Sequence, residues 1–150
     1  DWNNNELEKA IQGKIDHNIA KYLLWKYENH LESSGKSGYK LRRFDDIVNP
    51  ELEHIAPQTP KNGGSIANGY CRYDEEFKKE YIDCLGNYLL LSKSHNCSVG
   101  NKPFSEKYKT YVYLAQQREI QKLVPENGKW DKKVIKKRKD EIIKFIISKL

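Results

Sequence analysis

The chain has 150 residues, 37% hydrophobic and 11% aromatic, which is enough apolar material for one folded domain and excludes a disordered chain. No run of 18 apolar residues occurs, so no membrane-spanning helix is expected. Its three cysteines, Cys71, Cys84 and Cys97, form no Cys-x-x-Cys pair; this excludes a disulfide framework and a structural cysteine–zinc site, and favours free thiols in a reducing cytoplasm.

The net charge of +6 is concentrated in the second part of the chain. Residues 93–150 carry 15 Lys and Arg against 6 Asp and Glu, whereas residues 1–92 carry 12 against 15. A basic segment of this kind suits a polyanionic partner such as nucleic acid. A solvated, Lys-rich helix face explains the same excess, so charge alone leaves both interpretations open.

The first half of the chain predicts helices followed by short strands. Apolar residues at helical intervals predict one broken helix or two consecutive helices over residues 5–31, with a stop at Gly13 and a restart at Asp16. Alternating patterns predict strands over 39–44 and 52–55, and a segment rich in Pro, Asn and Gly predicts a mobile loop over 59–69. Asp74 is expected to cap a helix that runs to about residue 83 and buries Phe77, Tyr81 and Ile82.

The second half predicts a buried strand over 88–91 and then a series of helices. Ser92 or Ser94 caps a short helix, Pro103 begins another, and further helices are expected at about 112–123 and 130–149. We therefore expect a single α+β domain, mostly helical around a small hairpin. It divides into a helical lead-in (1–32), a core (50–110) and C-terminal helices (112–150). The chain does not begin with Met, which suggests a fragment of a larger protein.

The segment 52–58, LEHIAPQ, places Glu53 beside His54 shortly before a proline, and Asn87 and Asn96 follow nine residues apart. Phosphodiester hydrolysis needs a base for water and a cation that neutralises developing charge. A neutral imidazole suits the first role, which we assign to His54. Mg²⁺ prefers oxygen ligands, which Glu53 and Asn96 offer. Since neighbouring strand residues point to opposite faces, Glu53 and His54 share one site only if the strand ends or bulges there.

Other polar residues receive supporting assignments. We interpret Asn87 as the residue that pins the loop carrying His54. His95, beside Asn96, is an alternative metal ligand, whereas His17 and His30 are expected to be surface or helix-packing residues. Lys107, together with Lys93 and Lys102, is a candidate for contact with DNA phosphates, although each of these lysines is also explained as an ordinary solvated side chain.

A family resemblance rests on the order of these motifs. LEHIAPQ, LGNYLLLS, Asn96, Asn101-x-x-Phe-x-x-Lys107 and Trp130-x-x-x-x-Ile-x-x-Arg138 together resemble the C-terminal HNH nuclease domain of GmrSD-type restriction endonucleases, in the wider ββα-metal (HNH) superfamily. The HNH domain of CRISPR effector nucleases is similar in its acidic-His pair and two asparagines. The chain departs from the usual pattern at Tyr88, where Leu is common, and at Glu53, where many members have Asp.

The resemblance implies an α+β fold with a ββα-metal core and a metal-dependent DNA endonuclease of a restriction or anti-phage defence system. It implies His54 as general base, Glu53 and Asn96 as metal ligands and Asn87 as the loop-pinning residue of the catalytic set. It further implies Mg²⁺, with Mn²⁺ as the alternative, double-stranded DNA, including modified phage DNA, as the partner, and an N-terminal NTP-hydrolysing sensor domain outside this chain. The competing interpretations are an inactive HNH-fold module that binds DNA or protein, and an RNA-directed toxin.

Overall fold

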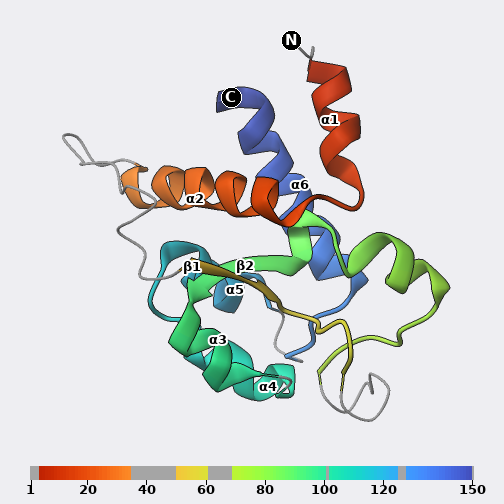
Figure 1. The fold of residues 1–150 in the computed structure, drawn as a ribbon, viewed down its shortest axis with the longest axis vertical. Helices are drawn as coiled ribbons and strands as arrows, with labels where there is room; N and C mark the ends of the chain where they lie inside the picture. The colour runs from red at the N-terminus through yellow and green to blue at the C-terminus, as the bar shows by residue number, and fades with distance from the viewer. Residues whose placement is uncertain (1–3, 35–49, 61–68, 101, 125–127, 150) are drawn as a thin grey trace.

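The structure is a computed structural model that describes residues 4–34, 50–60, 69–100, 102–124 and 128–149. It is a mixed α+β domain, so the predicted fold class is confirmed (Figure 1). Its helices are α1 (Asn4–Gln12), α2 (His17–Ser33), α3 (Lys93–Val99), α4 (Phe104–Lys107), α5 (Ala115–Leu123) and α6 (Lys132–Lys149). Its strands are β1 (Pro50–His54) and β2 (Tyr88–Ser92), and its short helical turns are the π-helix η4 (Phe77–Tyr81) and the 3₁₀ helices η5 (Leu85–Asn87) and η6 (Tyr108–Thr110).

The centre of the domain is an antiparallel hairpin of β1 and β2 that continues directly into α3, a ββα arrangement. The register pairs Pro50 with Ser92 at one end and His54 with Tyr88 at the other. The Ser92 hydroxyl accepts a hydrogen bond from the His95 backbone N–H and so caps α3. Since the cap is the last residue of β2, strand and helix are joined without a loop.

The hairpin lies between two helical layers, because alternate residues of each strand point to opposite faces. Figure 1 shows α2 and α6 on one side and α3 and α4 on the other. Leu90 belongs to the apolar cluster of α1, α2 and α6, whereas Leu89 and Leu91 belong to a second cluster with Phe104 and Trp130. Both faces of β2 are therefore buried, which explains its continuous apolar sequence.

Helix α5 covers the edge of β2 that β1 leaves unpaired. The Gln116 side chain accepts from the Leu90 backbone N–H at 3.1 Å, and the Gln117 amide donates to the Leu90 carbonyl at 3.0 Å. The Glu28 carboxylate of α2 accepts from the backbone N–H groups of Ala115 and Gln116 and so caps α5. These contacts close the sheet edge with side chains instead of a third strand.

Helix α6 packs tightly against η5, just before β2. A Cβ atom at Gly86 would overlap the backbone carbonyl of Ile135, so only glycine permits this approach. The buried Arg138 guanidinium donates to the carbonyls of Leu85 and Gly86, at 3.4 and 3.0 Å. Helix α6 and η5 are thereby fixed next to the start of β2, where Tyr88 pairs with His54.

Most predicted local features are confirmed. α1 ends before Gly13, Asp16 caps α2, and the Asp74 carboxylate accepts from the Phe77 N–H. Pro103 differs slightly, since it is the N-terminal flanking residue of α4 and not its first helical residue. The strand predicted over 39–44 and most of the loop predicted over 59–69 lie outside the described residues. Within the described ranges, no helix is both long and apolar enough to cross a membrane.

Candidate functional site

His54 is the last residue of β1, and its imidazole faces the α2 side of the hairpin. Its Nε2 lies 2.9 Å from Asp83 Oδ1, and the side chain is partly exposed, at 14%. The ring also meets Tyr88 edge-on, with centroids 4.8 Å apart, and His17 at 5.7 Å. His54 therefore belongs to a polar cluster at the surface end of the strand.

Asp83 is fixed by several donors. Its Oδ1 also accepts from the Tyr88 hydroxyl at 3.1 Å and the Gln58 amide at 3.3 Å. Burial acts to raise the pKa of Asp83, but hydrogen bonds from His54 and Tyr88 outweigh it and hold that pKa below its usual value. An ionised carboxylate only accepts, so His54 Nε2 carries a proton and Nδ1 keeps the lone pair. Burial lowers the pKa of His54, partly offset by Asp83, so the ring is neutral near pH 7.

Glu53 points to the other face of β1 and is only 5% exposed. Its Oε2 lies 3.4 Å from Lys107 Nζ and accepts from the Tyr111 hydroxyl at 3.3 Å. Burial raises the pKa of Glu53 to about 7 in spite of these partners. The Lys107 ammonium is itself fully buried and donates to the carbonyls of Ile55 (3.2 Å) and His54 (3.4 Å).

The placement of Lys107 corrects its assignment as a phosphate contact. Its ammonium is enclosed beneath the hairpin with Glu53, and burial lowers its pKa while Glu53 opposes this change. A side chain with 0% exposure does not reach a DNA backbone. Lys107 instead fixes the chain where β1 ends. The other two candidates, Lys93 and Lys102, are both exposed; Lys93 is the first residue of α3, and Lys102 follows the end of that helix.

Asn87 is completely buried, and its amide makes four hydrogen bonds. Its oxygen accepts from the Ala56 N–H and the Trp130 indole N–H, and its nitrogen donates to the carbonyls of Ala56 and Ile82, all at 2.9 Å. The segment just after His54 is thereby tied to the turn before β2 and to the start of the C-terminal region. Every donor and acceptor of this amide is used, so Asn87 has none left for a substrate.

Asn96 lies on α3, on the Glu53 side of the hairpin. Its amide nitrogen donates to Glu51 Oε1 at 2.8 Å. Glu51 and Glu53 are two residues apart in a regular strand and therefore share a face. The nearest charged neighbour of Asn96 is thus Glu51, a residue that we did not predict.

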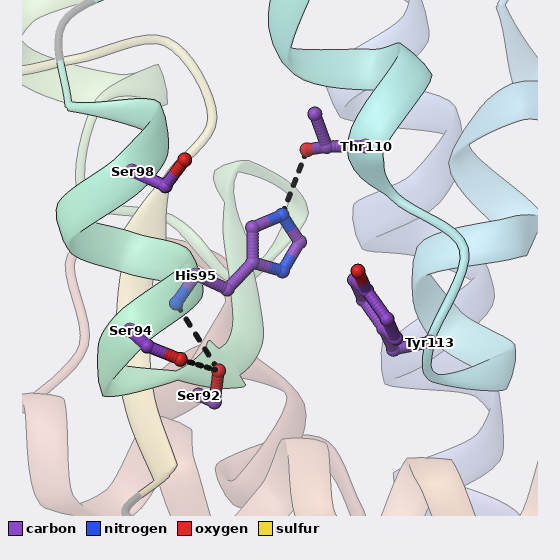
Figure 2. Close-up of a pocket in the computed structure, with 6 residues that line it drawn as sticks. All are labelled: Ser92, Ser94, His95, Ser98, Thr110 and Tyr113. Atoms are coloured by element: carbon purple, nitrogen blue, oxygen red, sulfur yellow. Dashed lines mark hydrogen bonds between the residues drawn. The ribbon is translucent and has the colours of Figure 1, made fainter.

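His95 lines a cavity of about 440 Å³ beside α3 together with Ser92, Ser94, Ser98, Thr110 and Tyr113 (Figure 2). Thr110 Oγ1 donates to the Lys107 carbonyl, so it accepts from His95 Nε2–H at 2.7 Å. Nδ1 is then an unprotonated acceptor, buried and without a hydrogen-bond partner among the described residues. Burial lowers the pKa of His95. The ring points toward Thr110 and Tyr113 (Figure 2).

The predicted site residues thus fall into separate groups. His54 is joined to Asp83 on one face of β1, Asn96 to Glu51 on the other, and Glu53 to Lys107 beneath the hairpin. β1 pairs regularly through His54, with none of the bulging that would turn both side chains to one point. Among the described residues, these hydrogen bonds do not bring His54, Glu53 and Asn96 together.

Three residues of the site were missed from the sequence. Glu51 was detectable, because a residue two positions before Glu53 shares its face. Asp83 and His17 carry no motif, since they approach His54 only through the packing of α2 and the turn before β2. His17 was assigned to the surface or to helix packing, and it is indeed exposed, but it also touches the His54 ring.

Comparison with known proteins identifies the family. The family model for the C-terminal domain of GmrSD restriction endonucleases matches residues 2–145. No curated protein and no solved structure gives a significant match. The matched residues include both strands, α3 and the buried residues Asn87, Trp130 and Arg138. The chain therefore belongs to the family of GmrSD restriction endonuclease C-terminal domains.

Proposed function

We propose that this chain is an HNH-type, metal-dependent endonuclease domain that hydrolyses DNA phosphodiester bonds in a restriction or anti-phage defence protein. The observation that carries the proposal is the Asp83–His54 pair at the end of β1 in a ββα core. Membership of a restriction endonuclease family supports the reaction class. The pair supplies an oriented imidazole where the resemblance predicts the general base.

His54 has the properties of a general base. Asp83 accepts the Nε2 proton, which leaves the Nδ1 lone pair to take a proton from water. As the ring gains charge, the Asp83 carboxylate stabilises the imidazolium and holds its orientation. The ring is partly exposed, so water reaches it.

The proposed divalent cation fits Glu51 and Asn96 better than Glu53. The Asn96 nitrogen is used by Glu51, which leaves the Asn96 amide oxygen and a carboxylate oxygen, the hard donors that Mg²⁺ or Mn²⁺ prefers. Glu53 is sealed with Lys107 and leaves no room for a cation that keeps its waters. We therefore propose Glu51 in place of Glu53. Such a cation, when bound, supplies charge neutralisation at the phosphate.

The partners proposed are double-stranded DNA, including modified phage DNA, and an N-terminal sensor domain that hydrolyses NTP, in the cytoplasm. The exposed Lys93 and Lys102 are suited to contact phosphates, and residues 93–150 carry the excess of positive charge. His95 is kept as an alternative metal ligand because its Nδ1 has no hydrogen-bond partner in the part of the chain that the structure describes.

An inactive DNA- or protein-binding module is the second candidate. It is favoured by the separate partners of His54 and Asn96, which occupy opposite faces of β1. A base and a cation ligand that act on one phosphate should converge, and in this conformation they do not. The two candidates predict different behaviour toward DNA.

Plasmid nicking with Mg²⁺ or Mn²⁺ separates them. We expect His54→Ala to lose about 10²–10⁴-fold in rate, as for removal of a general base. His30→Ala is the matched control, because His30 stacks on Phe145 at the far end of α2. Equal rates for wild type and His54→Ala would remove the base assignment. Salt-sensitive binding without cleavage would favour the module, and preferential cleavage of RNA would indicate a toxin.

A further inference from the structure

His17, His54 and Asp83 gather three metal-binding atoms in one place. One ligand atom from each lies within 4.8 Å of the other two. The residues come from the start of α2, the end of β1 and the turn before β2. Folding alone brings them together, since their positions in the sequence are far apart.

The cluster is held in place by contacts outside it. Asp16 caps α2 by accepting from the N–H groups of Asn18 and Ile19. His17 lies between Asp16 and Asn18, so the cap fixes its backbone. The Ile15 N–H donates to the Asp83 backbone carbonyl at 3.2 Å and ties this turn to Asp83. His54 is fixed through the ladder of β1. The backbone positions that carry the three side chains are therefore fixed by the fold.

We propose that this cluster binds a borderline transition cation of the Zn²⁺ class. Two imidazole nitrogens and one carboxylate oxygen are typical zinc ligands, whereas Mg²⁺ prefers oxygen alone. Ligand atoms around tetrahedral Zn²⁺ at about 2.1 Å lie about 3.4 Å apart. The ligand atoms, at most 4.8 Å apart, must come closer to one another, which the exposed His17 side chain leaves room for, and the 2.9 Å contact between His54 and Asp83 must open slightly.

Zn²⁺ at this site switches off the base, a consequence that rests on the proposed function. In the metal-free cluster His54 carries its proton on Nε2 and its lone pair on Nδ1. Zn²⁺ takes the Nε2 lone pair, so the neutral ring carries its one proton on Nδ1 instead, exchanged through water without net change. The atom that would accept a proton from water is then already protonated. Zn²⁺ is thus an inhibitor that acts apart from the activating cation.

Binding is tested directly by calorimetric titration of the metal-free chain with Zn²⁺. We expect one Zn²⁺ per chain, with affinity at least about tenfold weaker in His17→Ala, since even indirect neighbours of a metal change affinity by that factor. His30→Ala is the matched control and should bind as wild type does. Visible absorption of Co²⁺ in place of Zn²⁺ reports the same loss independently of heat. Unchanged affinity in a folded His17→Ala would overturn the site.

Inhibition is tested by adding Zn²⁺ to nicking reactions that contain Mg²⁺, each variant being compared with its own zinc-free rate. We expect wild type and His30→Ala to be inhibited at the same Zn²⁺ concentration, and His17→Ala to need at least about tenfold more. Equal inhibition of wild type, His30→Ala and His17→Ala, or stimulation by Zn²⁺, would overturn the proposal that Zn²⁺ at this site inhibits the base. If the chain does not cut DNA at all, the proposed function fails while the binding titration still decides the zinc site.

Discussion

Glu53 and His54 are neighbours in the sequence but occupy opposite environments. Glu53 lies beneath the hairpin, 5% exposed, with the fully buried Lys107 as its counter-ion. His54 lies at the rim, where Asp83 holds its Nε2 and solvent reaches the ring. The part of β1 around Glu53, here called the closed face, is therefore sealed and serves stability, whereas the end around His54, here called the open face, is accessible and offers chemistry.

The difference shows how a sheet divides a short motif. A carboxylate next to a histidine looks like one functional unit in the sequence, yet regular pairing of β1 sends the two side chains in opposite directions. Other elements of the fold supply the partners of these strand residues: Asp83 for His54, Asn96 for Glu51 and Lys107 for Glu53. Variants of these partners test whether the Glu53 environment serves stability and the His54 environment serves catalysis.

The largest effect is expected from Lys107→Met on the closed face. This change leaves Glu53 buried without a counter-ion and removes the donor to the Ile55 carbonyl. Loss of one partner of a buried ionised pair costs up to about 3–5 kcal/mol of unfolding free energy, and because the pKa of Glu53 is about 7, the loss that chemical denaturation measures should be larger at pH 8 than at pH 6. The exposed Lys109→Met is the control and should change stability by less than about 0.5 kcal/mol. Similar midpoints for both variants would show that Glu53 and Lys107 do not depend on each other.

The pH dependence of the unfolding free energy should report the protonation of Glu53 on the same closed face. Burial raises the pKa of Glu53 from 4.5 to about 7, so between these values the folded state binds more protons than the unfolded state. Unfolding free energy should therefore fall as pH rises through this range, by up to about 3 kcal/mol for this group. Glu53→Gln should flatten the slope. Burial also raises the pKa of Glu28 to about 7, so part of the slope should remain. An unaltered slope in Glu53→Gln would exclude Glu53 as its source.

Asn87 ties the segment after β1 to Ile82 and Trp130, and its loss should be nearly as severe. Asn87→Ala leaves the Trp130 indole N–H and the Ala56 N–H buried without acceptors. We expect a loss of about 2–4 kcal/mol, seen as a lower melting temperature. The half-buried Asn96, with its single bond to Glu51, is the matched position, and Asn96→Ala should cost less than about 1 kcal/mol while weakening Mn²⁺ binding. Matching melting curves would contradict the structural role of Asn87.

Local features of this domain were predictable because their causes are local. The caps at Asp16, Ser92 and Asp74 follow from side chains that bond to backbone N–H groups two or three residues away. The two strands follow from the apolar segments that flank Asn87 and His54, and their pairing gives the ββα core. These elements need no knowledge of distant residues.

The partners of the site depend on tertiary packing and were not predictable in the same way. Asp83 and His17 reach His54 only after α2 docks on the hairpin. Lys107 is different, because Phe104 and Lys107 are three residues apart on one helix and therefore share a face. If Phe104 packs in the core, Lys107 on the same helix face is buried as well, and the structure buries both. Helical periodicity could therefore have predicted that Lys107 is buried and does not contact DNA.

On the open face, Asp83→Asn tests whether the carboxylate orients and charges the base. The amide oxygen still accepts from His54 Nε2, but the negative charge that raises the pKa of His54 is lost. We expect about 10–100-fold slower nicking, with the acid limb of the pH–rate profile moved to lower pH. Gln58→Ala removes only an exposed contact to Asp83 and should change the rate about twofold at most. A slower rate with an unmoved limb would mean that Asp83 acts by orientation alone.

The smallest effects are expected at the exposed lysines beside α3. Lys93→Ala and Lys102→Ala should each weaken DNA binding modestly and reduce the slope of log affinity against log salt by about 1, as for loss of one phosphate contact. The exposed Lys78 and Lys79 belong to the part of the chain without excess positive charge, so alanine there should leave the slope unchanged. If alanine at Lys93 and Lys102 changes the salt slope no more than alanine at Lys78 and Lys79, DNA does not approach the α3 side. The phosphate would then have to reach His54 from the α2 side alone, away from Glu51 and Asn96, and the open face of β1 would carry all of the chemistry.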